Sequence, residues 1–223
     1  LKHIDEIGGP TTFNHFAWGW THAGNTPFRR WKRETYRGGT SDPFILSWPK
    51  GIKAKGEVRT QYAHAIDMVA TVLDALEIEP LTSLRGVTQA PIEGVSLVSS
   101  FEDGSAPGKH ITQYFEMLGH RSLYHDGWRA VCPWPGASFT ESGRKFGAEI
   151  SGDLLSELDA TGWELYHVAE DFAETKNLAA KERTRLISMI SLWYVEAGKY
   201  NVLPLDGRGT QRIPLPLDVA IEV

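Results

Sequence analysis

The chain has 223 residues, of which 41% are hydrophobic and 23% are charged, and these are ordinary values for a folded globular protein. Its net charge of −5 argues against a nucleic-acid-binding protein, because such proteins normally carry a basic surface. The longest apolar run, residues 63–76, is interrupted by Asp67 and Asp74 and is too short to cross a bilayer, so we expect no membrane segment.

The first half of the chain predicts part of an α/β layer. Residues 1–40 are rich in Gly, Pro, Asn, Thr and His and are typical of loops that carry sites. Residues 43–48, PFILSW, form a short apolar run that predicts a buried strand. A helix follows, with Ile66, Val69, Leu73 and Leu76 at helical spacing, and a buried strand before an amphipathic helix indicates an α/β arrangement.

The second half predicts a small antiparallel sheet with one helix. Asp126-Gly127 lies between two short aromatic runs, which predicts a type I′ hairpin turn. Residues 133–160 predict an inserted loop with about one helical turn, and Gly198 is expected to cap a later helix. The expected strands lie within residues 110–118, 121–125, 128–131 and 163–168, and the helix presents Leu186, Met189, Ile190, Trp193 and Ala197.

We therefore divide the chain into residues 1–105, residues 106–203 and an extended tail, 204–223. The chain begins at Leu1 without Met or a leader, and we expect it to be a piece of a longer protein. Its only cysteine, Cys132, cannot form an internal disulfide and is compatible with a reducing compartment such as the bacterial cytoplasm, without establishing it.

Several common kinds of site are not supported by the sequence. Neither a Walker A loop nor a dinucleotide-binding glycine motif is present, and the histidines show no closely spaced ligand pair. Cys132 is expected to be a small buried residue with no adjoining cation. Asp171 and Glu174 could form a carboxylate pair, but their position favours a solvated turn.

The stretch from Gly24 to Gly39, GNTPFRRWKRETYRGG, gathers cations around a Thr-Pro turn and ends in two glycines. Phe28, Trp31 and Thr35 stand at helical spacing, with Lys32 beside the aromatic side. A lysine held among rings suits a compact anion such as sulfate or phosphate. From these residues alone, Lys32 is either an anion ligand or a surface cation, and solvation that balances the acidic remainder is an open alternative for the neighbouring Arg29, Arg30, Arg33 and Arg37.

Here the sequence resembles the sulfatases of the alkaline phosphatase superfamily, specifically the large bacterial arylsulfatases. The similarity runs along nearly the whole chain and weakens in residues 133–160 and after about residue 208. It rests on residues 19–57, HAIDMVATVLDALEIEP from His64, PIEGVSL from Pro91, TQYFEMLGHRSLYHDGW from Thr112, WELYHVAEDFAETKNLA from Trp163 and NVLPLD from Asn201.

The resemblance implies the end segment of an α/β (alkaline phosphatase-like) domain followed by an α+β C-terminal subdomain with a small antiparallel sheet and one packed helix. It also implies hydrolysis of a sulfate ester by a formylglycine nucleophile with a divalent cation, usually calcium. In this family the lysine of the segment N-T-P-[FY]-x-x-x-K contacts the sulfate. That residue is Lys32 here, and Asn25 and His22 are expected near the mouth of the site as substrate-binding residues.

Two departures from the family pattern shape the expectation. Arg37 stands where many sulfatases have a glutamate before two glycines, and neither the nucleophile motif Cys/Ser-x-Pro-Ser-Arg nor the metal ligands occur in this sequence. The simplest interpretation is a C-terminal fragment that binds no cofactor alone and whose partner is the N-terminal part of the same polypeptide. The alternatives are a phosphonate monoester or phosphodiester hydrolase of the same superfamily and a non-catalytic binding module.

Overall fold

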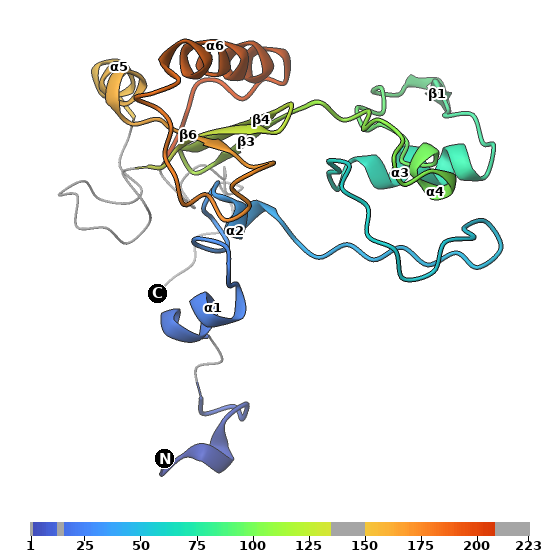
Figure 1. Ribbon diagram of the computed structural model, residues 1–223, viewed down its shortest axis with the longest axis horizontal. Coiled ribbons are helices and arrows are strands. Elements are labelled where there is room, and N and C mark those ends of the chain that lie inside the picture. The colour runs from blue at the N-terminus through green and yellow to red at the C-terminus, as the bar shows by residue number, and fades with distance from the viewer. Residues whose placement is uncertain (1, 13–15, 135–149, 208–223) are drawn as a thin grey trace. The chain divides into compact units, whose positions relative to one another are not determined.

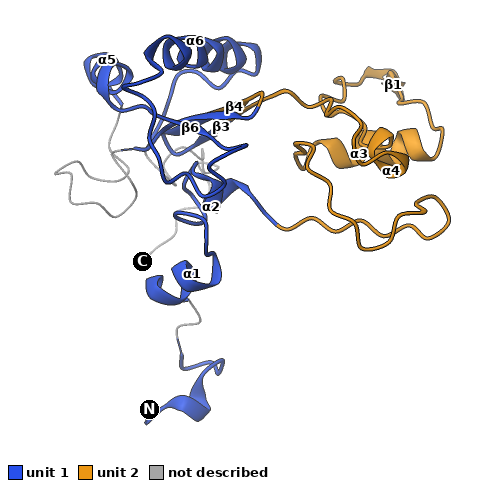
Figure 2. Cartoon of the chain, in the orientation of Figure 1, with its two compact units in different colours: residues 1–42, 115–122, 127–223 blue, residues 43–114, 123–126 orange. Residues whose placement is uncertain are grey.

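The computed structural model describes residues 2–12, 16–134 and 150–207 (Figure 1). The chain forms two compact units (Figure 2). Unit 1 comprises residues 1–42, 115–122 and 127–223, and unit 2 comprises residues 43–114 and 123–126. The division near residue 105 was drawn from composition and stays a prediction.

The main sheet has four strands in the order β3-β4-β5-β6. Asp126 and Gly127 join β4 to β5 with φ values of 45° and 79°, as a type I′ turn requires, so the predicted hairpin is confirmed. Strand β6 pairs antiparallel with β5, with Val131 opposite Glu164. The strands are β3 (Thr112–Met117), β4 (His120–His125), β5 (Trp128–Cys132) and β6 (Glu164–His167).

Two helices, α5 (Gly152–Thr161) and α6 (Arg183–Lys199), lie on one side of this sheet (Figure 1). The predicted α6 face is confirmed, since it buries four of the five predicted residues, and Trp193 donates to the Phe115 carbonyl oxygen at 3.2 Å. Gly198 does not cap α6, because the helix continues to Lys199 and Asn201 takes the positive φ instead. The buried residues are Leu186, Met189, Trp193 and Ala197.

Helix α5 is longer than the single turn predicted within residues 133–160. Its N-cap residue is Ser151, whose side chain accepts a hydrogen bond from the Leu154 amide and so satisfies one of the helix's first donors. Residues 135–149 of the predicted insertion lie outside the described residues.

The opposite side of the sheet is covered by the segment that includes α2 (Arg37–Thr40). Side chains alternate between the two faces of a sheet, and the two buried arginines lie on opposite faces. Arg121 on β4 contacts Asp159 of α5, whereas Arg129 on β5 donates to the hydroxyl of Thr40. Both faces of the sheet are therefore covered within unit 1.

Unit 2 contains α3 (Asp67–Ala75), α4 (Ser99–Glu102) and a two-stranded antiparallel sheet of β1 (Ser83–Leu84) and β2 (Val87–Thr88). The predicted helix at α3 is confirmed, but its buried face is not the predicted one. Asp67 and Thr71 are buried, while Val69 of the predicted apolar face is 57% exposed.

Hydrogen bonds explain this inverted burial of α3. The Asp67 carboxylate accepts from the backbone amides of His64 and Val95 and lies 2.8 Å from Nδ1 of His110. The Thr71 hydroxyl accepts from the Leu97 amide. A buried carboxylate with several donors is satisfied, so the polar face packs inward.

The predicted buried strand at residues 43–48 is wrong for this structure. The segment has no strand geometry and is exposed throughout, with Ile45 89% exposed. A strand needs a neighbouring strand to receive its backbone hydrogen bonds, and none of the described strands pairs with this segment.

The remaining elements are short, namely η1 (Ile4–Glu6) and α1 (Trp18–Gly24). Of the predicted tail, residues 204–207 are described and are irregular, and the rest lies outside the described residues. None of the helices in the described ranges combines the length and the hydropathy needed to span a membrane.

Candidate functional site

The cation-rich stretch forms a closed loop directly after α1. The half-buried side chain of Asn25 donates to the carbonyl oxygens of Arg30, at 2.6 Å, and Gly38, at 2.8 Å. These two bonds join the beginning of the loop to its middle and its end. Asn25 therefore holds together the loop that carries Lys32.

The two glycines let this loop pack closely on α2. A Cβ atom at Gly38 would lie 2.1 Å from the Arg29 carbonyl oxygen and 2.2 Å from that of Arg30. The close approach at Gly38 is therefore to the loop's own backbone. The helical spacing at residues 28–35 does not produce a helix, because Arg30 and Arg33 adopt positive φ values of 64° and 82°.

Lys32 is exposed in a turn of this loop, and His22 is exposed on α1. Trp31, next to Lys32, is half-buried, and its ring centroid lies 6.2 Å from that of Trp18. The backbone carbonyl oxygen of His22 accepts from the Asn25 amide at 3.2 Å and from the Thr26 hydroxyl at 3.1 Å, which joins α1 to the start of the loop. Among the described residues, no hydrogen bond joins the side chains of His22 and Lys32.

Two of the neighbouring arginines, Arg29 and Arg37, are not simply solvated. Arg29 donates to the Tyr166 hydroxyl at 2.7 Å and lies over the Tyr36 ring, 4.6 Å from its centroid. Although burial opposes it, the nearby hydroxyls and Glu164 raise the pKa of Arg29. A planar guanidinium can stack on a ring and donate at its edge, which explains why this cation turns inward.

Arg37 also turns toward protein atoms. Its guanidinium lies 4.2 Å from the ring centroid of Phe172 and 5.0 Å from that of Phe28, and it donates to the Phe172 carbonyl oxygen at 2.9 Å. Arg37, which departs from the family's glutamate, thus packs against two rings that contact each other, with their centroids 4.9 Å apart. Arg29 and Arg37 of the loop thus contact protein atoms, whereas Lys32 is exposed to solvent.

A buried carboxylate, Glu174, lies behind the loop. Its side chain accepts a hydrogen bond from the Arg37 amide at 2.8 Å and approaches Nε of Arg129 to 3.2 Å, as an ion pair without hydrogen-bond alignment. The predicted solvated position is therefore wrong for Glu174. It is confirmed as a turn for Asp171, which accepts from the amides of Thr175 and Lys176.

A second buried group behind the loop is His120. Burial, together with the nearby Arg33 and Arg30, lowers the pKa of His120 to about 4. The ring is therefore neutral near pH 7, and its Nδ1 accepts from the Trp134 amide at 3.1 Å. Glu34 lies 3.6 Å from the same nitrogen and makes no ion pair with the neutral ring.

Two phenols complete the buried layer. The hydroxyls of Tyr36 and Tyr166 both donate to the Glu164 carboxylate, at 2.9 Å and 2.5 Å. Burial and the adjacent carboxylate raise the pKa of both phenols far above the ordinary value, so both keep their protons. Tyr36 also packs with Val131 in the hydrophobic core.

The described residues contain no candidate metal centre, and their one cysteine, Cys132, is buried. No group of three His, Cys, Asp or Glu side chains in the described ranges is arranged to hold a metal ion. Cys132 is buried as predicted, but Nη2 of Arg121 lies 3.2 Å from its sulfur, so the expectation of no adjoining cation is wrong. Burial nevertheless raises the pKa of Cys132 to about 11.

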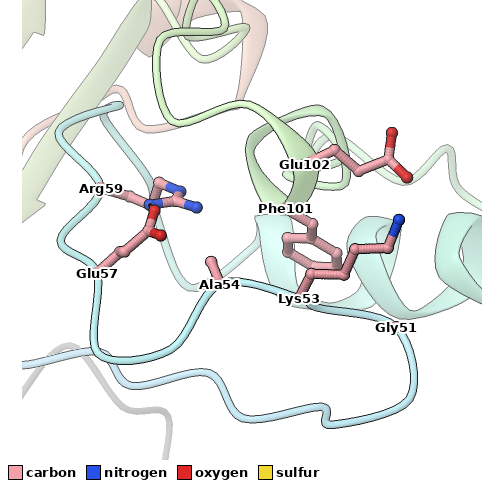
Figure 3. Close-up of a pocket in the computed structure, with 7 residues that line it drawn as sticks. All are labelled: Gly51, Lys53, Ala54, Glu57, Arg59, Phe101 and Glu102. Atoms are coloured by element: carbon pink, nitrogen blue, oxygen red, sulfur yellow. Dashed lines mark hydrogen bonds and ion pairs between the residues drawn. The ribbon is translucent and has the colours of Figure 1, made fainter.

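Unit 2 contains a cavity of about 430 Å³ of its own (Figure 3). Arg59 donates to Glu57 at 2.8 Å and to the Ser100 carbonyl oxygen at 2.7 Å. Charges of both signs thus face this cavity. The lining residues are Gly51, Lys53, Ala54, Glu57, Arg59, Phe101 and Glu102.

Sequence reasoning missed the residues that support the loop from behind, above all Glu174 and Arg129. Glu174 stands in the WELYHVAEDFAETKNLA motif, so the motif was recognised but the role was not. Its partner Arg37 is 137 residues away in the chain. No local spacing reports a contact between residues so far apart.

The comparisons with known proteins point to one group. Human N-sulphoglucosamine sulphohydrolase is 27% identical over 191 residues, which cover 74% of this chain and 38% of that protein. An uncharacterized sulfatase of Schizosaccharomyces pombe is 24% identical over 203 residues, which cover 90% of this chain and 32% of that protein. The chain thus spans about a third of the length of these curated relatives. No family model matches it.

Solved structures resemble the chain in fold. A protein from a core genetic locus for metabolism of multiple glycosaminoglycans in Bacteroides thetaiotaomicron has a TM-score of 0.53 at 17% identity, over 78% of this chain and 32% of its own. The protein Ps i-CgsB has a TM-score of 0.53 at 15% identity, over 83% and 34%. The sequence relatives and the predicted motifs agree that the chain is related to the sulfatases.

Proposed function

We propose that this chain is part of a sulfuric ester hydrolase, and that Lys32 supplies a cation that contacts the sulfate group. The observation that carries the proposal is the contrast within one loop. Arg29 and Arg37 turn toward protein atoms, whereas Lys32 remains exposed on a loop that Asn25 closes. The sequence relationship to sulfatases supports the same assignment.

The chemistry asks for a fixed positive charge at this point. Cleavage of a sulfate ester builds negative charge on the sulfuryl and leaving oxygens, and a positioned ammonium stabilises that charge. An ammonium donates in three directions and matches a tetrahedral anion as a point charge. A loop that is held by internal hydrogen bonds and close packing keeps such a charge in place without cost at each turnover.

The other two proposed residues differ in what they can offer. The side-chain amide group of Asn25 donates both of its hydrogen bonds to carbonyl oxygens of the loop. We therefore assign Asn25 mainly to holding the shape of the loop, and less to contact with the substrate. His22 is exposed on the helix that precedes the loop and remains a proposed substrate-binding residue.

The formylglycine and the divalent cation, proposed as Ca²⁺, are assigned to the full-length enzyme outside this chain. The described residues offer no ligand cluster, and the thiol of Cys132 is buried and protonated at neutral pH. We therefore expect the isolated chain to be inactive on aryl sulfates. No step of the reaction is assigned to these groups here.

The test is a kinetic comparison in the complete gene product that contains this chain. Lys32→Ala is expected to lower kcat/KM for an aryl sulfate by about 100-fold or more, with Lys32→Arg intermediate. Lys176→Ala is the matched control, because Lys176 is also exposed in unit 1 and contributes only its backbone amide to the Asp171 turn. Equal activity of Lys32→Ala and wild type would contradict the assignment.

Substrate class is decided in the same assay. Matched sulfate esters, phosphonate monoesters and phosphodiesters compete for the same wild-type protein, since all present tetrahedral oxyanions. A higher kcat/KM for the sulfate ester supports the proposal. A higher value for a phosphorus ester reassigns the reaction, and no hydrolysis of any of them favours a binding module.

A further inference from the structure

We infer that Glu174 is the positioning residue for the loop that carries Lys32. The inference rests on the proposed function for its catalytic consequence, and on the contacts of Glu174 for its structural part. Glu174 is fully buried, and it is the point where the segment after β6 meets the far end of the loop.

Three contacts connect Glu174 with the loop and the sheet. Its carboxylate accepts from the Arg37 amide at 2.8 Å, and its own carbonyl oxygen accepts from Nη1 of Arg29 at 3.1 Å. These contacts lie on either side of Lys32 in the sequence. The same carboxylate pairs with Arg129 of β5 at 3.2 Å, which ties it to the sheet.

Arg129 extends the support from the sheet side. Its guanidinium donates to the Thr35 carbonyl oxygen and, at 2.9 Å, to the hydroxyl of Thr40. A further bond of 3.0 Å, to the Ser122 hydroxyl, fixes it on the neighbouring strand. The guanidinium and the carboxylate thus brace residues 35–40 together, at the base of the loop.

Glu174 reaches its position through a backbone constraint of its own. Its φ is 56°, in the left-handed region that side-chain-bearing residues seldom adopt. It closes the turn in which its amide donates to the Asp171 carbonyl oxygen at 3.2 Å. Such a conformation persists where surrounding contacts over-determine it, as the contacts to Arg29, Arg37 and Arg129 do here.

The consequence for catalysis is indirect. Glu174 is fully buried and contacts Arg29 and Arg37 of the loop. We therefore infer that it affects Lys32 only by holding the loop in place. A displacement of about 1 Å at a charge that must face a transition state can reduce the rate by about 100-fold. Loss of the Glu174 carboxylate is therefore expected to lower kcat/KM by about 10- to 100-fold in the complete gene product.

Two measurements on the complete gene product test the inference. The first is hydrogen exchange of residues 29–40, which Glu174→Ala should accelerate by at least 10-fold at the Arg37 amide. Glu174→Gln keeps an acceptor for that amide and should restore most of its protection. Asp159→Asn is the control, since it breaks a comparable ion pair, Arg121–Asp159 at 2.8 Å, on the opposite face of the sheet. It should lower stability without changing exchange in residues 29–40.

The second measurement is a double-mutant cycle with Lys32→Ala. If Glu174 acts through Lys32, Glu174→Ala should cost about 10- to 100-fold alone and less than about 2-fold in the Lys32→Ala background. Full additivity of the two effects, or unchanged exchange in residues 29–40, overturns the positioning role. An active protein that is insensitive to Lys32→Ala instead overturns the proposed function, and hydrogen exchange still decides whether Glu174 holds the loop.

Discussion

Gly39 and Glu34 approach each other so closely that no side chain fits between them. A Cβ atom at position 39 would lie 2.0 Å from the Glu34 carbonyl oxygen and 2.7 Å from that of Trp31. Glycine is needed here for close packing and not for a positive φ. The residues on both sides of Lys32 are therefore pressed against α2.

Gly39→Ala is predicted to lower the free energy of unfolding by about 1–3 kcal/mol, because the backbone must move to admit the methyl group. Gly24→Ala is the matched control, since a Cβ atom there meets nothing within 4 Å and α1 ends at that residue. It should be neutral or stabilising by under about 1 kcal/mol. Chemical denaturation measures both, and equal stability of Gly39→Ala and wild type would contradict the packing.

The lowered pKa of His120 predicts that the folded protein loses stability in acid. Its folded pKa is about 4, below the ordinary 6.5, so the unfolded chain binds the proton first as the pH falls. Stability is therefore retained above about pH 6.5 and is lost progressively between about 6.5 and 4. From pH 7 to pH 5 the contribution of this one group is about 2 kcal/mol.

The variant His120→Asn isolates this effect, because its amide oxygen can still accept from the Trp134 amide. It should be less stable than wild type at pH 7 and should lose about 2 kcal/mol less between pH 7 and pH 5. Urea denaturation at pH 7 and pH 5 measures this change in unfolding free energy for both proteins. An equal change in the two proteins would mean that His120 is not the buried neutral group described.

Local patterns in the sequence predicted the elements whose partners are near in the chain. The Asp126-Gly127 turn needs two positive φ values, and the sequence offers residues that tolerate them. The buried face of α6 follows a 3.6-residue period, and it was predicted from Leu186 to Ala197. The coarse fold, a small antiparallel sheet with a packed helix, follows from these features.

Patterns that depend on distant partners misled the prediction. The apolar residues of α3 look like a core stripe, but Asp67 is the residue that finds partners, at positions 64, 95 and 110. Glu174 looks solvated next to Asp171, although Arg37 and Arg129 bury it. A charged side chain is predicted to be exposed unless the sequence shows which oppositely charged residues will pair with it.

The candidate site was predicted through resemblance more than through local chemistry. Residue spacing left Lys32 either an anion ligand or a surface cation, and only the family motif favours the first. The structure adds that Asn25 and the glycine pair hold the loop in place. The exposure of Lys32, in contrast with the inward-turned Arg29 and Arg37, supports the first interpretation, and its contact with sulfate stays a prediction.

Asp67 is predicted to be the most sensitive carboxylate of unit 2. Asp67→Ala leaves the partly buried amides of His64 and Val95 and the buried ring of His110 without their acceptor, so it should cost about 3–5 kcal/mol of unfolding free energy. Asp74→Ala removes a carboxylate from the exposed part of the same helix and should cost under about 1 kcal/mol. Comparable losses in the two variants, measured by chemical denaturation, would contradict the buried role of Asp67.

Cys132 is predicted to resist alkylation in the folded protein. Burial raises its thiol pKa to about 11, from an ordinary value of 9.0, although Arg121 opposes the shift. At pH 8 the thiolate fraction then falls about 100-fold, and the thiolate is the reacting form. Labelling with iodoacetamide, followed at this residue by mass spectrometry, should be at least about 100-fold slower in the folded protein than in urea. The Arg121 guanidinium lies 3.2 Å from the sulfur and favours the thiolate. Labelling of Arg121→Gln should therefore be at least as slow as labelling of wild type, unless the substitution opens the fold. Equal labelling rates for folded and denatured wild-type protein would show that the thiol is accessible and that Cys132 is not buried as described.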